Sequence, residues 1–462
     1  MSLSYRNVRL ARVLAIALPL VAAAPAGAAV VSVKDTRATS TSDLTFKAAR
    51  GEVNRVRFEV KAKRVTVTDA GARLQAGRGC TAAGAHQVVC KTRLDEFYSY
   101  NVSLGDGDDR ATFLQRGGGE LAIPDVTAGR GDDVVRAGSL KRYGFLTGGP
   151  GDDRITGTTD SDTIRGGAGR DILIGLKGSD QFVTDPSGAA GDDDEVRGGP
   201  GADEVSYSGR TRPISIDLRR SSPQGSAGEK DVFHSVESAV GTVRDDKLLG
   251  NAAENDLQGI GGRDVIEGYG RDDRVWSAGG KRKDTAPDTM SGGAGADIVL
   301  SEGGGTAAGG PGDDEFQGSG TLDGGQGDDV FEPTGGQVEC GAGDDGVSIG
   351  NVTPPVLVDC ESVRLGRNQE LSISLPLQRA DDAIVASGLN CDQEDGPTPD
   401  GKLCNSELTV ALGDELLAKG TLDANNRTTL RMAYEQGAKE ALGADPKQVR
   451  AAVGKYSFYS FL

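Results

Sequence analysis

A nine-residue period constrains this chain more strongly than any other feature of its sequence. Over residues 148–183, an aspartate is followed two positions later by an apolar residue, and the pair recurs every nine residues. The pairs are Asp153 with Ile155, Asp162 with Ile164, Asp171 with Leu173, and Asp180 with Phe182. A short repeat of this kind predicts a stack of equivalent units, because one unit is too small to bury a core of its own.

Each unit predicts one short parallel strand and one turn. Side chains alternate along a strand, so only the central apolar residue of a three-residue segment faces inward. The other six residues, in the pattern G-G-x-G-x-D, reverse the chain, and glycine permits the positive φ that such a turn requires. Two units complete a coil, so Asp153 is expected beside Asp171 and Asp162 beside Asp180. The predicted fold is all-β: a parallel β-roll or β-solenoid of nonapeptide repeats, flanked by small β-rich domains.

Stacked aspartates predict a bound cation. Equivalent carboxylates in adjacent coils would lie ~4.8 Å apart and repel by roughly 0.9 kcal/mol per pair in water, or about 3.5 kcal/mol at an effective dielectric of 20. Six to eight oxygen ligands in a flexible geometry are typical of Ca²⁺, whereas Mg²⁺ requires a tighter octahedron. The acidic composition, with 69 Asp+Glu against 51 Lys+Arg and a net charge of −18, also favours cations over nucleic acid or an anionic membrane.

The repeat resembles that of the RTX (hemolysin-type) calcium-binding proteins. Units such as GGPGDDRIT, GGAGRDILI and GGAGADIVL match the pattern G-G-x-G-x-D-x-U-x nearly letter for letter. The resemblance implies a β-roll with Ca²⁺ between successive turns, bound by sixth-position aspartates and glycine carbonyls. The aspartates in the more regular units are Asp153, Asp162, Asp171, Asp180, Asp264, Asp273, Asp297, Asp314 and Asp329. Those in imperfect or interrupted units are Asp109, Asp133, Asp194, Asp203, Asp246, Asp288 and Asp345.

Two units depart from the pattern. Asn255 replaces the carboxylate and should weaken its half of a site, and GTTDSDTIR (157–165) lacks most of its glycines. We therefore look for a missing ion first at Thr158–Asp160. Fifth-position aspartates, such as Asp152 and Asp328, are expected to be solvated charges rather than ligands.

The first 28 residues predict a cleavable export signal. Three arginines precede a twelve-residue apolar run (13–24), which is too short to span a bilayer and is followed by Ala26-Gly27-Ala28. The sequence therefore predicts a soluble extracellular protein, or one associated with the cell surface, without a membrane span. Six cysteines fit disulfides in such a protein, although they permit fifteen connectivities; a zinc site is the weaker interpretation. Their spacing suggests the neighbouring pairs Cys80–Cys90, Cys340–Cys360 and Cys391–Cys404.

Shifts in pattern divide the chain into six segments. They are a signal peptide (1–28), a small antiparallel β domain (29–103), a first repeat block (104–206), a linker insert (207–240), a second repeat block (241–365) and a β-rich C-terminal domain (366–462). Inserts as long as 207–240 are expected to loop out or to end a stack. In the last segment, 406–412 and 427–434 predict strands, and 439–456 predicts a short helix interrupted near Pro446.

The sequence contains little that indicates catalytic activity. His86 and His234 are the only histidines, and H-E-x-x-H does not occur. The match to G-x-S-x-G at GVSIG (346–350) lies within the second repeat block and predicts no strand-to-helix elbow. The first hypothesis is a secreted, calcium-stabilised structural or binding module without catalytic activity, whose partner on a cell surface or in an extracellular matrix is unknown. The alternative is an extracellular hydrolase with its active site in 29–103 or 366–462 and the roll as a folding or carrier module.

Overall fold

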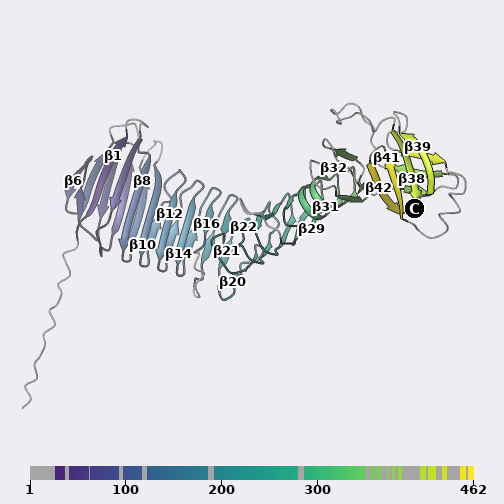
Figure 1. Cartoon of the computed structure of the whole chain (residues 1–462). Coiled ribbons are helices and arrows are strands. Elements are labelled where there is room, and N and C mark those ends of the chain that lie inside the picture. Colours follow the sequence, from purple (N-terminus) through teal and green to yellow (C-terminus); the bar gives the residue numbers. More distant parts are fainter. Residues whose placement is uncertain are drawn as a thin grey trace, which may run out of the picture.

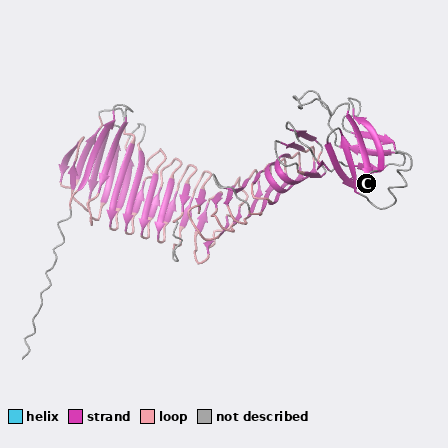
Figure 2. Cartoon of the chain, in the orientation of Figure 1, coloured by secondary structure: helices cyan, strands magenta, loops and turns pink. Residues whose placement is uncertain are grey.

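The computed structural model is an elongated stack of strands (Figure 1). It describes residues 27–36, 41–61, 63–92, 97–116, 122–185, 192–278, 286–349, 355–358 and 360, and beyond these only strands within 362–461. Strands and loops account for this described part, which contains no helix and hence no helix able to cross a membrane (Figure 2). The predicted all-β fold is confirmed. Almost all of the predicted signal peptide lies outside the described residues.

Two faces of parallel strands form the roll. Each coil contributes one strand to each face, and the eighteen-residue offset appears directly in the register, where Arg154 pairs with Ile172 and Thr163 with Gln181. The first face consists of β10 (Ile123–Arg130), β12 (Phe145–Pro150), β14 (Thr163–Ala168), β16 (Gln181–Val183), β18 (Glu204–Ser206), β22 (Ser238–Val240), β24 (Asp256–Ile260), β26 (Arg274–Ala278), β28 (Ile298–Ser301), the starts of β30 (Glu315–Gln326) and β31 (Val330–Ala342), β32 (Gly346–Ile349) and β34 (Ser362–Leu365).

The second face is divided in two. Its lower part consists of β9 (Arg110–Gln115), β11 (Val134–Arg136), β13 (Arg154–Thr156), β15 (Ile172–Ile174), β17 (Glu195–Arg197) and β21 (Val232–His234). Its upper part consists of β19 (Ile214–Asp217), β23 (Lys247–Leu249), β25 (Val265–Gly270), β27 (Asp288–Ala294), β29 (Gly305–Pro311), the ends of β30 and β31, and β33 (Val356–Val358). Inward residues such as Ile155 and Leu173 are buried, and one continuous core runs through the roll.

Antiparallel hairpins cover the N-terminal end of the roll. Their strands are β1 (Ala29–Thr36), β2 (Thr41–Lys47), β3 (Arg55–Lys61), β4 (Arg64–Asp69), β6 (Cys80–Gly84) and β7 (Gln87–Lys91), and the short strand β5 (Leu74–Ala76) pairs in parallel with β1. Strand β2 pairs in parallel with β8 (Ser99–Asp106), β8 pairs in parallel with β10 of the first face, and β3 pairs in parallel with β9. This N-terminal cap (29–92) therefore shares its core with the roll, and the expected boundary at residue 103 falls within β8.

The insert 207–240 does not loop out, and it ends the stack on the second face only, where β21 is the edge strand of the lower part. The expectation that the insert loops out or ends the whole stack is therefore wrong. Strand β21 pairs with β17, β22 pairs with both β18 and β24, and β19 pairs with β23 and with the short antiparallel strand β20 (Gly225–Ser226). The physical reason is that the insert supplies its own inward residues, including Ile216, Phe233 and Ala239, all of which are buried. Its segment SAGEKDVFH (226–234) retains an aspartate followed two positions later by an apolar residue.

Strands also fill the described part of the C-terminal segment. They are β35 (Ser372–Ile373), β36 (Leu377–Arg379), β37 (Ala383–Ser387), β38 (Ser406–Leu412), β39 (Glu415–Leu422), β40 (Thr429–Ala433), β41 (Gln448–Val453) and β42 (Tyr456–Phe461). The predicted helix over 439–456 is wrong where it can be compared, because β41 pairs in antiparallel fashion with β38 and β42. Residues 439–447 lie outside the described part.

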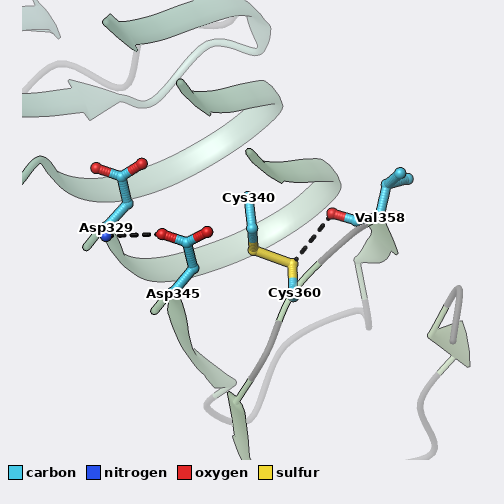
Figure 3. Close-up of a disulfide and its surroundings, with 5 residues drawn as sticks. All are labelled: Asp329, Cys340, Asp345, Val358 and Cys360. Carbon is cyan, nitrogen blue, oxygen red and sulfur yellow. Dashed lines mark hydrogen bonds between the residues drawn. A yellow bond between two sulfur atoms is a disulfide. The ribbon is translucent and has the colours of Figure 1, made fainter. Parts of the chain in front are cut away.

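Two of the predicted disulfides are present. Cys80 is bonded to Cys90 in the cap, and Cys340 is bonded to Cys360 near the last coils of the roll. The third predicted pair, Cys391–Cys404, lies outside the described residues. Figure 3 shows the Cys340–Cys360 disulfide beside the last turns that carry an aspartate.

Candidate metal centre

Every predicted site aspartate lies at the start of a strand and is buried, with at most 3 % of its surface exposed. Because the strands stack, these side chains form three rows, one along the first face and one along each part of the second face. The first row contains Asp162, Asp180, Asp203, Asp273, Asp297, Asp314, Asp329 and Asp345; the second contains Asp109, Asp133, Asp153, Asp171 and Asp194; the third contains Asp246, Asp264 and Asp288.

One carboxylate oxygen of each interior aspartate is held by the neighbouring coil. The backbone N–H of Asp153 donates to Asp171 Oδ1 at 2.8 Å, and the N–H of Asp162 donates to Asp180 Oδ1 at the same distance. The last link of the first row, from Asp329 N to Asp345 Oδ1, is drawn in Figure 3. This ladder fixes the orientation of the carboxylates and leaves Oδ2 to be accounted for.

The second oxygen is buried and lacks a hydrogen-bond partner within the described part of the chain at many of these aspartates. They are Asp109, Asp133, Asp153, Asp171, Asp180, Asp203, Asp273, Asp297, Asp314 and Asp329. A buried polar atom without a partner costs free energy comparable to a lost hydrogen bond. A whole row of such oxygens therefore requires a positively charged or hydrogen-bonding group beside it.

First-position glycines leave the space that such a group needs. A Cβ on Gly148 would lie 2.0 Å from Asp153 Oδ2 and 2.6 Å from the carbonyl oxygen of Gly166 in the next coil. At Gly268 the corresponding distances, to Asp273 Oδ2 and the carbonyl oxygen of Gly292, are both 2.3 Å. A carboxylate of one coil thus meets a carbonyl of the next beside a missing side chain.

This donor set suits a hard cation with oxygen ligands. Within the described ranges, no three His, Cys, Asp or Glu side chains gather in metal-binding geometry, so backbone carbonyls have to complete any coordination sphere. Carboxylates combined with backbone carbonyls are typical Ca²⁺ ligands. The residues present therefore fit Ca²⁺ better than a metal that prefers nitrogen or sulfur ligands.

Burial makes these carboxylates hard to ionise on their own. It raises the pKa of Asp153 to about 8, with a further contribution from the charges of Asp171 and Asp133. Burial likewise raises the pKa of Asp171 and of Asp180 to about 7. At Asp194, burial and the neighbouring charges raise the pKa to about 9. A cation in the row would reverse this tendency, because an opposite charge favours the ionised form.

The turns keep one backbone shape even where glycine is absent. Positive φ occurs at the second and fourth positions, as at Gly149 (133°) and Gly151 (144°). Leu176 (91°), Ile260 (84°) and Tyr269 (89°) occupy the second position with the same sign of φ. Such a conformation costs of order 1–3 kcal/mol for a residue with a side chain, and it persists where the surroundings demand it, often at ligand sites.

Comparison with known families agrees with this geometry. A family model described as the RTX calcium-binding nonapeptide repeat, in four copies, matches residues 147–182 and 284–305. The chain carries RTX repeats over these residues. A search of curated proteins found no match to it. The matched residues include the most regular coils, and the calcium-binding character of RTX repeats supports Ca²⁺ as the cation of the rows.

Two further carboxylates belong to the RTX rows and were missed by the sequence analysis. Asp231 continues the second row, where its Oδ1 accepts from Asp194 N at 2.9 Å. Glu237 continues the first row, where its Oε2 accepts from Asp203 N at 3.0 Å. The signal for Asp231 was its spacing of two from Phe233, whereas Glu237 follows it by only six residues and breaks the nine-residue count.

A buried arginine holds the RTX roll together at the insert. Arg210 donates to Asp192 Oδ2 at 3.1 Å and to Glu229 Oε1, and all three side chains are almost completely buried. Tyr207 stacks under the guanidinium and donates its hydroxyl to Asp231 Oδ2. The end of the second row is therefore linked to a fixed positive charge that belongs to the protein itself.

Fifth-position aspartates form a separate, exposed ladder. The N–H of Asp152 donates to Asp132 Oδ1 at 2.9 Å, and the N–H of Asp328 donates to Asp313 Oδ1 at the same distance. In this ladder the donor belongs to the later coil, whereas in the buried rows it belongs to the earlier coil. The exposed ladder matches the expected solvated charges.

Proposed function

We propose that this RTX-repeat protein is an exported, non-catalytic module whose roll is stabilised by Ca²⁺ held in the buried aspartate rows. The observation that carries the proposal is the repeated meeting of a buried Asp Oδ2 with a carbonyl of the next coil, as at Asp153 and Gly166. When bound, Ca²⁺ supplies the positive charge that offsets both the burial of the carboxylates and their mutual repulsion.

The chain's own groups perform the remaining work. The Oδ1 ladder orients each carboxylate, positive φ at the second and fourth positions turns the backbone, and the missing Cβ of the first-position glycine keeps the space open. The inward Ile155 and Leu173 exclude water from the interior on the other side of the strand. Binding thereby becomes coupled to folding, because these ligands meet only when two coils are stacked.

Two observations support export and the absence of catalysis. The disulfides Cys80–Cys90 and Cys340–Cys360 fit an oxidising, extracellular environment. His86 places Nδ1 2.7 Å from the carbonyl oxygen of Ala72, a structural contact, and His234 is exposed with Nε2 4.0 Å from Glu195. Neither contact is with a serine, threonine or cysteine that a histidine base could activate.

A calcium titration of the full mature chain tests the proposal. After treatment with EDTA and dialysis, we expect Ca²⁺ at millimolar concentration to increase the far-UV signal of β-structure cooperatively, and Mg²⁺ at the same concentration to leave it unchanged. An identical spectrum with EDTA and with Ca²⁺ would overturn the calcium function. Turnover of ester, glycoside or peptide substrates, abolished by one point substitution, would instead overturn the non-catalytic part.

A further inference from the structure

The RTX turns are of two kinds, distinguished by the sign of φ. In the open turns, the second and fourth positions both have positive φ, as at Leu176 with Gly178. In two turns that begin Gly-Thr this pattern is absent, and we call these the closed turns. Across the described residues, positive φ occurs neither at Thr158 and Asp160 nor at Thr242 and Arg244, which hold the equivalent positions.

The first closed turn satisfies its own carboxylate. Thr158 N donates to Asp162 Oδ2 at 2.5 Å, and Thr158 Oγ1 donates to Asp162 Oδ1 at 3.0 Å. Gly144 N also donates to Asp162 Oδ1 at 2.6 Å. The Thr158 hydroxyl accepts from Asp160 N at 3.1 Å, which holds the closed conformation. Asp162 Oδ2 still lies beside the carbonyl oxygen of Gly175, since a Cβ on Gly157 would be 2.3 Å from the first and 2.9 Å from the second, but here the carboxylate oxygen also has a backbone N–H as its partner.

The second closed turn repeats this arrangement at a distant place in the chain. Thr242 N donates to Asp246 Oδ2 at 2.5 Å, and Thr242 Oγ1 donates to Asp246 Oδ1 at 3.1 Å. The hydroxyl of Thr242 again accepts from the residue two positions on, Arg244 N, at 3.0 Å. Two independent turns with the sequence G-T-x-x-x-D thus close in the same way.

Both closed turns stand at the start of a row. The residue that donates to Asp162 from the preceding strand is Gly144, and the one that donates to Asp246 is Ile214, so neither aspartate has a carboxylate before it. The second row begins with a neutral residue, Asn54, whose N–H donates to Asp109 Oδ1 at 2.6 Å. A first coil has a stacked carboxylate on one side only, and an internal donor is the alternative to a cation shared by two coils.

A third closed turn shows the same replacement with an amide. Asn251 N donates to Asn255 Oδ1 at 2.6 Å, and Asn255 Nδ2 donates to the carbonyl oxygen of Glu237 at 2.8 Å. The amide thus supplies the positive hydrogen that a carboxylate lacks. Neither Asn251 nor Ala253, two residues on, has positive φ within the described chain.

We propose that the second-position threonine decides which acidic turns bind calcium. A turn with the sequence G-T-x-x-x-D binds none, and the open turns bind the ions. This inference rests on the proposed calcium function. Asp162 and Asp246 lie in the rows as stabilising residues at their starts, with Thr158 and Thr242 in the place of an ion. The unusual turn at Thr158–Asp160 is therefore a device that starts a row.

Counting bound calcium in the full chain tests this assignment. Thr158→Gly removes the hydroxyl and permits positive φ, so native mass spectrometry at saturating Ca²⁺ should show one more ion per chain than in the wild type, and the Thr158→Gly/Thr242→Gly double variant should show two more. Thr159→Gly is the matched control, because Thr159 lies in the same turn and donates to Leu140 O instead of Asp162. Its count should equal that of the wild type.

A second pair of variants keeps the test decisive if Thr158→Gly does not fold. Asp162→Asn should retain the wild-type count, whereas Asp171→Asn, in an open turn, should lower it. Unchanged counts in Thr158→Gly, or a lower count in Asp162→Asn, would overturn the inference while leaving the calcium function intact. A wild-type protein that binds no Ca²⁺ would instead overturn the proposed function itself.

Discussion

The N-terminal cap and the regular coils are built from strands of one continuous core, yet they are stabilised differently. The cap contains antiparallel hairpins, a disulfide and large aromatic side chains, with Phe46 edge-on to Phe58 at 5.8 Å, and Phe58 stacks at 4.7 Å on Phe113 of the adjoining roll strand β9. The coils around Asp153 and Asp171 have three-residue strands, a thin aliphatic core and buried carboxylate oxygens. Apolar burial dominates in the first region, whereas we propose that the second depends on an added positive charge.

Removing calcium should separate the two regions, and this is the largest expected effect. In EDTA, amides of the coils over 154–174 should exchange with solvent within seconds, because unbalanced carboxylates destabilise every coil. Amides of β3 and β4 in the cap should remain protected. Hydrogen exchange of the full chain, followed by mass spectrometry with and without Ca²⁺, measures both regions in one sample. Equal loss of protection in the cap would show that its stability also depends on the ion.

Arg210 supplies a buried positive charge that EDTA cannot remove, and it can therefore be compared with the calcium rows. Arg210→Met leaves Asp192 and Glu229 buried without their partner, which costs about 3–5 kcal/mol. Because the charge belongs to the protein, chemical denaturation should show this loss at saturating Ca²⁺. Arg212→Met changes an exposed arginine of the same segment and should lower stability by less than about 0.5 kcal/mol. A loss for Arg210→Met no greater than that for Arg212→Met would contradict the role of the buried cluster.

Two glycines of one turn sharpen the view of how the coils make room for an ion. A Cβ at Gly268 would lie 2.3 Å from Asp273 Oδ2, so Gly268→Ala should cost about 1–3 kcal/mol and lower the number of bound calcium ions. At Gly270 the nearest atom to a Cβ, the carbonyl oxygen of Ala294, is 3.9 Å away. Gly270→Ala should therefore retain both stability and calcium count. Equal behaviour of the two variants in calorimetry would rule out the space beside Asp273 as part of a site.

Acid should partly replace calcium in the coils, by a smaller amount. The folded pKa of Asp153 is about 8 and that of Asp171 about 7, above the ordinary value of 3.8. A folded state that holds protons more tightly than the unfolded state is most stable below pH ~4 and loses that stability as the pH rises toward 8. In EDTA, the circular dichroism of the coils should thus indicate more structure at pH 5 than at pH 8. A rise in structure with pH would contradict the raised pKa values.

The nine-residue period was enough to predict the coils, their eighteen-residue register and the stacking of the aspartates in rows. Local chemistry explains why the rest was missed. Asp231 and Glu237 lie six residues apart, so a fixed period cannot place both, although stacked strands do. The sign of φ is not determined by glycine alone either, since Leu176 has the positive value and Thr158 does not. The predicted helix near Pro446 failed because 448–453 pairs with two other strands.

The interruption of only one face has a consequence for cooperativity. In a linear array, stability spreads through contacts between neighbours, and a break in those contacts insulates the parts on either side. The first face runs unbroken past the insert, because β22 pairs with both β18 and β24. The second face changes partners there, from β21 to β19. We therefore expect ions in the first row to be coupled across both blocks through paired strands, and ions in the second and third rows to be coupled through paired strands only within their own block.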